Sequence, residues 1–302
     1  MRKDRDHGLA RDLAELEGLA VGRRHMLGLM ASAGSTAFLV GCGGSDSSSA
    51  STDVTISTGT STATPTPTPT SSDSSSSGSS SSSSTCTVYA DETNGPYPAD
   101  GTNTSNGATS NVLVTSGVVR SDIRSSFISS STVAGGVMVT FTITLVDAND
   151  SCSPLAGYAV YVWHCDADGD YSLYDLPGES YLRGVQVTDE NGQCTFTTIF
   201  PGCYAGRYPH IHFEAYSSLS NATSGRYAVL ISQFAMPADA CTTVHASSDY
   251  SGTSQRNFAS TSIASDNVFG DNMTAQQSAM TVTMSGSVAD GYTASATVGI
   301  AT

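Results

Sequence analysis

The chain has 302 residues, of which 12 are basic and 27 acidic, and its formal net charge at pH 7 is −15. The basic residues are unevenly placed: the first 42 residues hold six of them, and residues 43–302 hold six against 22 acidic residues. Because residues 43–302 are so acidic, they should repel the phosphate backbone of nucleic acids and anionic lipid surfaces. We therefore exclude a nucleic-acid partner.

The first 42 residues have the features of an export signal. Arg23 and Arg24 precede an apolar stretch, residues 26–40, which is too short to span a bilayer comfortably and suits a signal-peptide core. The arginine pair resembles a twin-arginine signal, and Leu39-Val40-Gly41-Cys42 resembles a bacterial lipobox, whose cysteine becomes lipidated. We expect an exported protein anchored at the cell envelope or cell surface through Cys42. A plain secretory signal with a chance cysteine is the alternative.

Residues 43–85 are dominated by Ser, Thr, Gly, Pro and Asp. A segment with so few apolar residues cannot offset the entropy lost on ordering, so we expect a disordered tether. Residues 86–302 remain as one foldable domain that is large enough for a sizeable core.

The domain is expected to be mainly β. In residues 137–145, apolar side chains alternate with Met and Thr, which predicts a strand with one buried face. Asn191-Gly192 is a strong hairpin-turn signal between residues 185–187 and 194–196. Many short strands with such turns predict an antiparallel β-sandwich with long loops. Further strands are expected at 158–163, 195–200, 210–216, 227–234, 280–288 and 292–300, and residues 247–277 are expected to be mostly loop with a helical turn.

Apart from Cys42 there are six cysteines, none of them in a C-x-x-C pair. An even number fits disulfide bonds in an oxidising compartment, and buried free thiols are the alternative. We expect Cys165 and Cys203 to form disulfides that stiffen their loops. The sequence leaves the pairing open among Cys86, Cys152, Cys165, Cys194, Cys203 and Cys241.

His210 and His212 lie two residues apart in a predicted strand. Alternate side chains of a strand point to the same face, so both imidazoles project together while Ile211 and Phe213 point to the core. Two imidazoles on one face form half of a transition-metal site. A surface pair or a hydrogen-bonded pair is the alternative.

Several separated motifs surround this pair. Phe200-Pro201-Gly202-Cys203-Tyr204-Ala205-Gly206-Arg207 comes just before it, and Trp-His-Cys-Asp-Ala-Asp-Gly-Asp-Tyr-Ser (residues 163–172) and Tyr181-Leu182-Arg183-Gly184 lie further upstream. Glu92-Thr93-Asn94-Gly95-Pro96-Tyr97 and Ser232-Gln233-Phe234 add two outer motifs. In this order the motifs resemble the intradiol ring-cleavage dioxygenases, which include catechol and protocatechuate dioxygenases. The resemblance is closest over residues 155–216.

The resemblance implies a site for ferric iron, Fe(III), because phenolate oxygens and imidazole nitrogens suit that ion. The implied metal ligands are Tyr171, Tyr204, His210 and His212. Tyr204 is also implied to accept a substrate proton, and Arg207 to stabilise negative charge that develops on the ring. The family's glutamine falls on Gln233. The implied substrates are a catechol-type aromatic and O2, and the implied product is a muconate-type diacid.

We interpret the residues next to the implied metal ligands as structural rather than catalytic. Trp163 is assigned to the core, and His164 is interpreted as structural. The Asp-rich residues 166–170 are interpreted as a solvated turn that presents Tyr171 rather than as a calcium loop. Arg183 either braces the pocket or pairs with an acid.

Two other classes of protein stay open. One is a lipid-anchored β-sandwich module that binds polysaccharide or protein, and the other is an envelope copper-binding protein that uses His210 and His212. Neither needs both Tyr171 and Tyr204, whereas a ferric catecholate site needs both. The sequence shows no counterpart of the helical segment that many catechol dioxygenases use to dimerise, so no oligomeric state is carried over.

Overall fold

A computed structural model describes residues 86–302 of the chain. The predicted export signal, its Cys42 and the predicted tether lie outside the described residues. Among residues 86–302, no helix is both long and apolar enough to cross a membrane.

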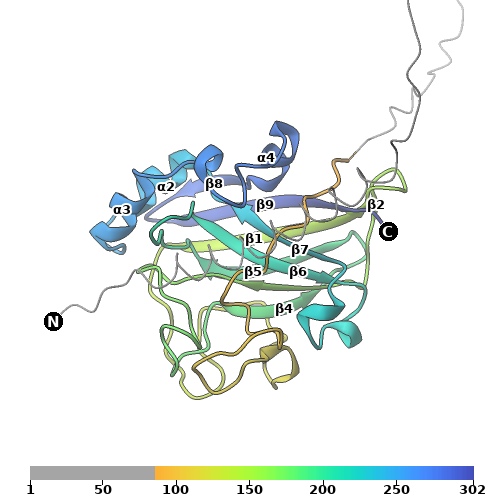
Figure 1. Ribbon diagram of the computed structural model, residues 1–302, viewed down its shortest axis with the longest axis horizontal. Coiled ribbons are helices and arrows are strands. Elements are labelled where there is room, and N and C mark those ends of the chain that lie inside the picture. The colour runs from red at the N-terminus through yellow and green to blue at the C-terminus, as the bar shows by residue number, and fades with distance from the viewer. Residues whose placement is uncertain (1–85) are drawn as a thin grey trace, which may run out of the picture. The chain divides into compact units, whose positions relative to one another are not determined.

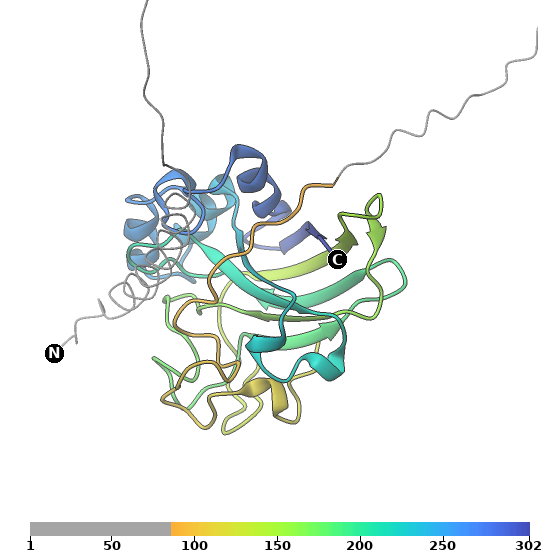
Figure 2. The ribbon, with the colours of Figure 1, turned by 45° about the vertical axis from the view of Figure 1, so that its right-hand side comes forward.

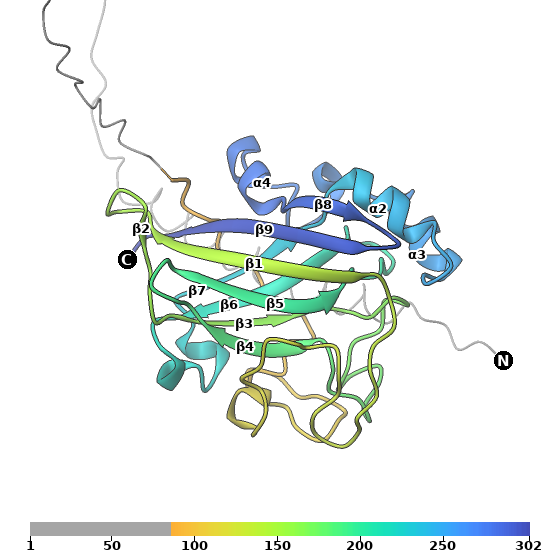
Figure 3. The same ribbon diagram turned by 180° about the vertical axis from the view of Figure 1, so that it is seen from behind.

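The domain is built from two stacked β-sheets (Figure 1). The first sheet has the order β2-β1-β9-β8, and β5 pairs with the same edge of β1 as β2, opposite β9; the second sheet has the order β4-β3-β6-β7. Figure 3 shows the first sheet in front of the second. The strands are β1 (Met138–Asp147), β2 (Ser153–Pro154), β3 (Ala159–Trp163), β4 (Arg183–Val187), β5 (Gln193–Ile199), β6 (His210–Tyr216), β7 (Leu230–Ala235), β8 (Thr283–Ser287) and β9 (Gly291–Ile300).

The predicted β-sandwich is confirmed, with two differences in strand pairing. The strands β1 and β9 run parallel, whereas the other named pairs are antiparallel. The predicted hairpin at Asn191-Gly192 is wrong, because β4 pairs with β3 in one sheet and β5 pairs with β1 in the other. A tight turn does occur there: Gly192 has φ +72° and donates its N–H to Asp189 O. The turn reverses the chain at a corner between sheets.

Phenylalanines from both sheets fill the core between them. Phe213 on β6 stacks on Phe234 of β7 with ring centroids 4.3 Å apart, and Phe141 of β1 meets the Phe234 ring edge-on at 4.9 Å. All three side chains are buried. Burying one such side chain stabilises a fold by about 1.5–3 kcal/mol, so these contacts fix how the sheets stack.

The second sheet is also covered on its outer face. The segment that begins at residue 86 crosses this sheet, and Figures 1 and 2 show it in orange running down to the loops at the lower end. Glu92 N donates to Ile231 O of β7, and Tyr89 donates its hydroxyl to Gln233 O. Further along, Tyr97 packs in the buried cluster that contains Trp163 on the outer face. As a result, every residue of β6 is buried on one face or the other.

Helices gather at the end of the domain next to β8 (Figure 1). They are α2 (Ala238–His245), α3 (Gly252–Phe258) and α4 (Thr274–Met280), and single 3-10 turns occur at η1 (Val112–Val114), η2 (Leu219–Asn221), η3 (Gly225–Tyr227) and η4 (Ile263–Ser265). The stretch 247–277, expected to be mostly loop, is therefore more helical than predicted. Helices this short owe their stability to tertiary packing rather than to helix propensity, which is why their sequence signal is weak.

One disulfide is present among the described cysteines, between Cys86 and Cys152. It ties the start of the domain to the loop that follows β1. The expectation that Cys165 and Cys203 form disulfides is wrong, because both are buried free thiols, as are Cys194 and Cys241. The Cys203 thiol contacts Arg207 O instead, at 3.5 Å.

Candidate functional site

The site begins as one row of residues across the second sheet. Arg183 of β4 is paired with Trp163 of β3, Trp163 with His212 of β6, and His212 with Gln233 of β7. Residues paired across neighbouring strands project to the same face, so the row lies on the outer face of the sheet. Trp163 lies parallel to the His212 ring, with centroids 4.8 Å apart and an interplanar angle of 7°. This packing fixes the plane of the His212 imidazole.

The two histidines present the same ring atom to one point. Nε2 of His210 and Nε2 of His212 are 3.1 Å apart, and both side chains are buried. The Nδ1 atom of His210 is hydrogen-bonded to Tyr208 O, so Nδ1 carries the proton and Nε2 keeps its lone pair. Burial, assisted by the charge of Arg207, lowers the pKa of His210 to about 3, and burial lowers that of His212 as well. Both imidazoles are therefore neutral.

The two predicted tyrosines reach the same point. The hydroxyl of Tyr171 is 3.5 Å from Nε2 of His210, and the hydroxyl of Tyr204 is 3.4 Å from it. Tyr171 is buried, whereas Tyr204 is partly exposed. The structure thus brings all four predicted ligands together, and the Tyr204 side of the cluster is the one that meets solvent.

Tyr171 is presented by an aspartate-rich turn. Asp166 accepts the backbone N–H groups of Asp168 and Asp170 through Oδ1, and Asp175 accepts that of Tyr171. The predicted solvated turn is therefore present. Tyr97, from the upstream motif at residues 92–97, stacks on the Tyr171 ring with centroids 4.5 Å apart and holds it against the sheet.

Tyr204 is presented by a turn that requires glycine. A Cβ atom on Gly202 would lie 2.5 Å from Asp166 O, so no other residue fits without displacing that backbone. Side chains of helix α3 hold both the backbone N–H and the backbone C=O of the next residue, Cys203. Cys203 N donates to Ser254 Oγ at 3.1 Å, and Asn257 Nδ2 donates to Cys203 O at 2.8 Å.

Arg207 and Gln233 also lie together beside the histidines. A terminal nitrogen of the Arg207 guanidinium donates to Gln233 Oε1 at 2.6 Å, and Gln233 donates in turn to Thr93 O at 3.0 Å. Arg207 Nε donates to Asp266 Oδ2 at 2.9 Å, and this ion pair is buried on both sides. The six predicted site residues therefore form one continuous cluster.

Comparison with known proteins shows which family the chain resembles. A profile described as "Dioxygenase" matches residues 125–220, which include the tyrosines, the histidines and Arg207. A catechol 1,2-dioxygenase of Acinetobacter baylyi is 39% identical over 64 residues, or 20% of this chain, and the match spans only 20% of that relative's length. The solved structure of an intradiol ring-cleavage dioxygenase from Tetranychus urticae is 25% identical, with a TM-score of 0.54 over 72% of this chain and 95% of that one. The chain resembles the intradiol ring-cleavage dioxygenases in its motifs and in its fold.

A further solved dioxygenase supports the fold alone. It is 24% identical, with a TM-score of 0.52 over 72% of this chain and 95% of that chain. The predicted resemblance to the intradiol dioxygenases is therefore confirmed for family and fold.

The residues present fit a ferric ion. The cluster offers two phenol oxygens and two imidazole Nε2 lone pairs directed at one point, and burial keeps the imidazoles unprotonated. Oxygen and nitrogen donors of this kind suit Fe(III). Among residues 86–302 no group of three or more His, Cys, Asp or Glu side chains competes as a metal site.

Asp266 is the member of this intradiol dioxygenase cluster that the sequence did not reveal. It follows η4, in the stretch expected to be loop, and its side chain is buried. Burial by itself raises the pKa of the Asp266 carboxyl, but the charge and hydrogen bonds of Arg207 lower it below its usual value, so Asp266 is ionised. A lone aspartate without a motif gives no sequence signal. Its burial beside Arg207 is visible only in the structure.

The remaining neighbours are structural. His164 is hydrogen-bonded through Nδ1 to Cys165 O and through Nε2 to Thr198 Oγ1, as expected for a structural histidine. Arg183 pairs with no acidic side chain within residues 86–302. It donates to Ser172, Pro98 O and the hydroxyl of Tyr161, and thus braces the loop that carries Tyr171.

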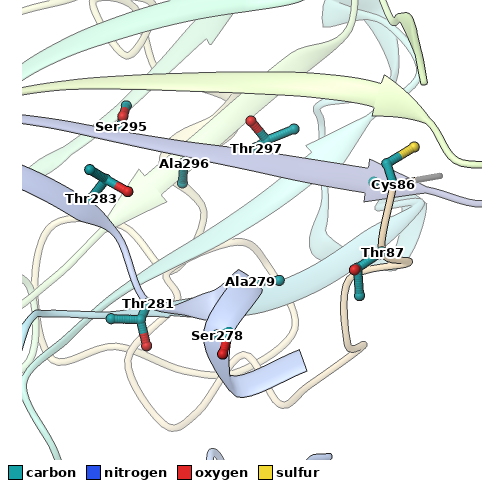
Figure 4. A pocket seen from close by; sticks show the side chains of 10 residues that line it. Cys86, Thr87, Ser278, Ala279, Thr281, Thr283, Ser295, Ala296 and Thr297 are labelled. Carbon is teal, nitrogen blue, oxygen red and sulfur yellow. The ribbon is translucent and has the colours of Figure 1, made fainter. Parts of the chain in front are cut away.

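A recess of about 350 Å³ lies apart from this cluster, between α4 and the outer side of β9 (Figure 4). Hydroxyl side chains such as Ser278, Thr281 and Thr297 line it, together with Cys86. None of the predicted site residues lies there, and Cys86 is bound in the disulfide. The recess therefore offers no group for acid–base or metal chemistry.

Proposed function

We propose that this protein is a non-haem Fe(III) dioxygenase that adds both atoms of O2 to a catecholic ring and opens it between the two hydroxyl-bearing carbons. The product is a muconate-type diacid, which contains every atom of the catechol and of O2. The observation that carries this proposal is the convergence of Tyr171, Tyr204, His210 and His212 on one point. Bound there, ferric iron would supply a Lewis acid that takes both catechol oxygens and draws electron density from the ring.

Tyr204 has the placement that a proton acceptor needs. It is partly exposed and lies on a turn, so its hydroxyl can meet a substrate that enters from solvent. We assign it the proton of one catechol hydroxyl, which a positioned base can accept within hydrogen-bond reach. Tyr171 is buried against Tyr97 and keeps its position.

Arg207 and Gln233 supply polar groups beside the reacting ring. Asp266 and Gln233 hold the Arg207 guanidinium in one orientation, next to the histidine pair. Guanidinium N–H donors that are held in one orientation stabilise negative charge as it develops on the ring. Because the group is already oriented, no reorganisation is needed during the reaction.

The test is the visible absorption spectrum of the purified full chain with an iron assay, before and after addition of catechol. The proposal predicts stoichiometric iron, a tyrosinate-to-iron band, a shift of that band with catechol, and oxygen uptake. Tyr227→Phe serves as the matched control, because Tyr227 is exposed and outside the cluster. A protein that stays colourless after ferric loading and consumes no oxygen with catechol would refute the proposal.

The same cluster bears on the copper alternative. A copper site built on His210 and His212 has no use for two phenols, yet both phenols lie within 3.5 Å of His210 Nε2. Tight binding of copper without any tyrosinate–iron spectrum would favour that alternative.

We also propose that the protein is exported and held at the cell envelope by a lipid on Cys42. The support is the sequence alone, namely the arginine pair at residues 23–24, the apolar stretch and the lipobox-like motif. Replacing Cys42 by Ser should release the protein from the membrane fraction and abolish incorporation of labelled fatty acid. Unchanged fractionation and labelling would contradict the assignment.

A further inference from the structure

Asp266 holds together several parts of the site. Its Oδ2 accepts hydrogen bonds from Arg207 Nε at 2.9 Å and from Tyr208 N at 2.7 Å. Its Oδ1 accepts from Arg207 at 3.3 Å and from the backbone N–H groups of Val268 and Phe269 at 2.9 and 3.1 Å. Tyr208 in turn accepts the Nδ1 proton of His210 through its carbonyl oxygen. One carboxylate therefore fixes both the guanidinium of Arg207 and the peptide that orients a histidine.

The same carboxylate cancels the charge of Arg207. The two groups form an ion pair at 2.9 Å with side-chain exposures of 1% and 0%, so solvent screens neither of them. A substrate in the site then meets a neutral pair rather than a cation. A carboxylate on the substrate would instead face the negative charge of Asp266 across the guanidinium.

No other cation of the described domain is placed to replace Arg207. Residues 86–302 contain no lysine and six arginines. Arg183 is the other buried arginine near the cluster, and it donates hydrogen bonds to Ser172, Pro98 O and the hydroxyl of Tyr161. Arg120 donates to Arg183 O and Ser125 O, Arg124 pairs with Asp122, and Arg226 and Arg256 are exposed.

We infer that Asp266 is a positioning and specificity-determining residue that makes this site select uncharged catechols over catechols bearing a carboxylate. The inference rests on the proposed dioxygenase function. Asp266 acts through Arg207 and Tyr208 rather than by touching the substrate. Its removal should therefore change both the rate with catechol and the choice between substrates.

The test uses the full-length, iron-loaded protein and the variant Asp266→Asn. Asparagine keeps the size and an acceptor oxygen but removes the negative charge that Asp266 places beside Arg207. Oxygen uptake gives kcat and KM for catechol and for 3,4-dihydroxybenzoate, and the iron content and visible band are recorded for each variant. Asp266→Glu restores the charge, and Asp122→Asn removes the carboxylate of a surface pair with Arg124, N···O 2.7 Å, as the matched control.

We expect Asp266→Asn to retain iron and its visible band, and to lose roughly tenfold or more in kcat for catechol with a smaller change in KM. The ratio of kcat/KM for 3,4-dihydroxybenzoate to that for catechol should rise by about tenfold, because the negative charge of Asp266 no longer repels the substrate carboxylate. Asp266→Glu should return the ratio toward the wild-type value, and Asp122→Asn should leave it unchanged. A ratio within about twofold of wild type in Asp266→Asn overturns the inference.

A measurement on the wild-type protein tests the inference even where the Asp266→Asn variant does not fold. Phenol and 4-hydroxybenzoate are titrated into the iron-loaded protein, and the shift of the visible band gives each dissociation constant. Phenol should bind at least about tenfold more tightly. Equal or tighter binding of 4-hydroxybenzoate overturns the inference. A protein without iron and without activity on either catechol refutes the proposed function, whereas a working dioxygenase without the substrate preference refutes only the role of Asp266.

Discussion

A buried pair of carboxyl groups next to the site gives a testable dependence of stability on pH. Glu214 follows His212 on the same face of β6, and both Glu214 and Asp100 are fully buried. Oε2 of Glu214 accepts the hydroxyl of Tyr216, Oε1 has no N–H or O–H donor among the described residues, and the side chain of Glu214 interacts with the Asp100 carboxyl. Two carboxylates can only accept, so a proton must lie between them.

Burial, and then the charge of Asp100, raise the pKa of Glu214 well above its usual value. The folded chain therefore keeps a proton that the unfolded chain releases above about pH 4.3–4.5. Because the native state binds more protons, stability must fall as the pH rises through this interval. The loss is about 1.4 kcal/mol for each pH unit between the unfolded pKa and the folded one.

Glu214→Gln should remove this dependence. The amide oxygen can still accept from Tyr216, and the amide nitrogen can donate to Asp100 in place of the shared proton. The variant should gain stability relative to wild type by at least about 1.4 kcal/mol between pH 5 and pH 8. Denaturant unfolding at matched iron content measures the difference, with exposed Glu190→Gln as the control. A Glu214→Gln difference that is constant from pH 5 to pH 8 would refute the shared proton.

Three further changes probe the site and its support. Tyr204→Phe should keep the fold, because the residue is partly exposed, but lower turnover by roughly 10²–10⁴-fold through loss of the proton acceptor, as measured by oxygen uptake. Asn257→Ala removes the hydrogen bond to Cys203 O and should cost about 1 kcal/mol in unfolding free energy while shifting the tyrosinate band. Breaking the Cys86–Cys152 bond with a double Ala variant opens a loop of 66 residues and should lower unfolding free energy by about 2–4 kcal/mol with little change in the spectrum.

Each of these changes has a matched control. Tyr227→Phe should leave turnover unchanged, and full activity in Tyr204→Phe would contradict the assigned role. Asn221→Ala removes a surface hydrogen bond to Ser217, so an equal spectral shift there would argue against the helix α3 support. Reducing agent should destabilise the wild type as much as the double Ala variant. A wild type insensitive to reduction would contradict the role of the disulfide.

The strands were predictable because their signal is local. In β1, Val139, Phe141, Ile143 and Leu145 are buried and alternate with Thr, which is the pattern read from the sequence. Pairing partners are not local. The Asn191-Gly192 turn has the chemistry of a hairpin, but β5 pairs along seven residues of β1 in the other sheet. A turn signal fixes where the chain reverses, and burial decides which strand it then joins.

The site divides in the same way. His210 and His212 lie two residues apart on one strand, and Tyr204 and Arg207 lie in the turn before it. All four could therefore be predicted from local sequence motifs. Asp266 reaches Arg207 from 59 residues away. Nothing in its own neighbourhood distinguishes it from the solvated aspartates. The predicted disulfides of Cys165 and Cys203 were wrong for a related reason. An even number of cysteines fits disulfides, but the Cys203 thiol contacts a backbone carbonyl rather than another sulfur.

The alternation of β6 explains how rigid and movable groups coexist in this site. Ile211 and Phe213 bind the strand into the core between the sheets, so His210 and His212 on its other face inherit the rigidity of the sandwich. Packing of that density makes displacement of either imidazole costly. Tyr204 is different, because it is partly exposed and lies on a turn. In the proposed mechanism, the group that exchanges its contact for a substrate proton is therefore best placed at Tyr204, the one of the four residues that is partly exposed.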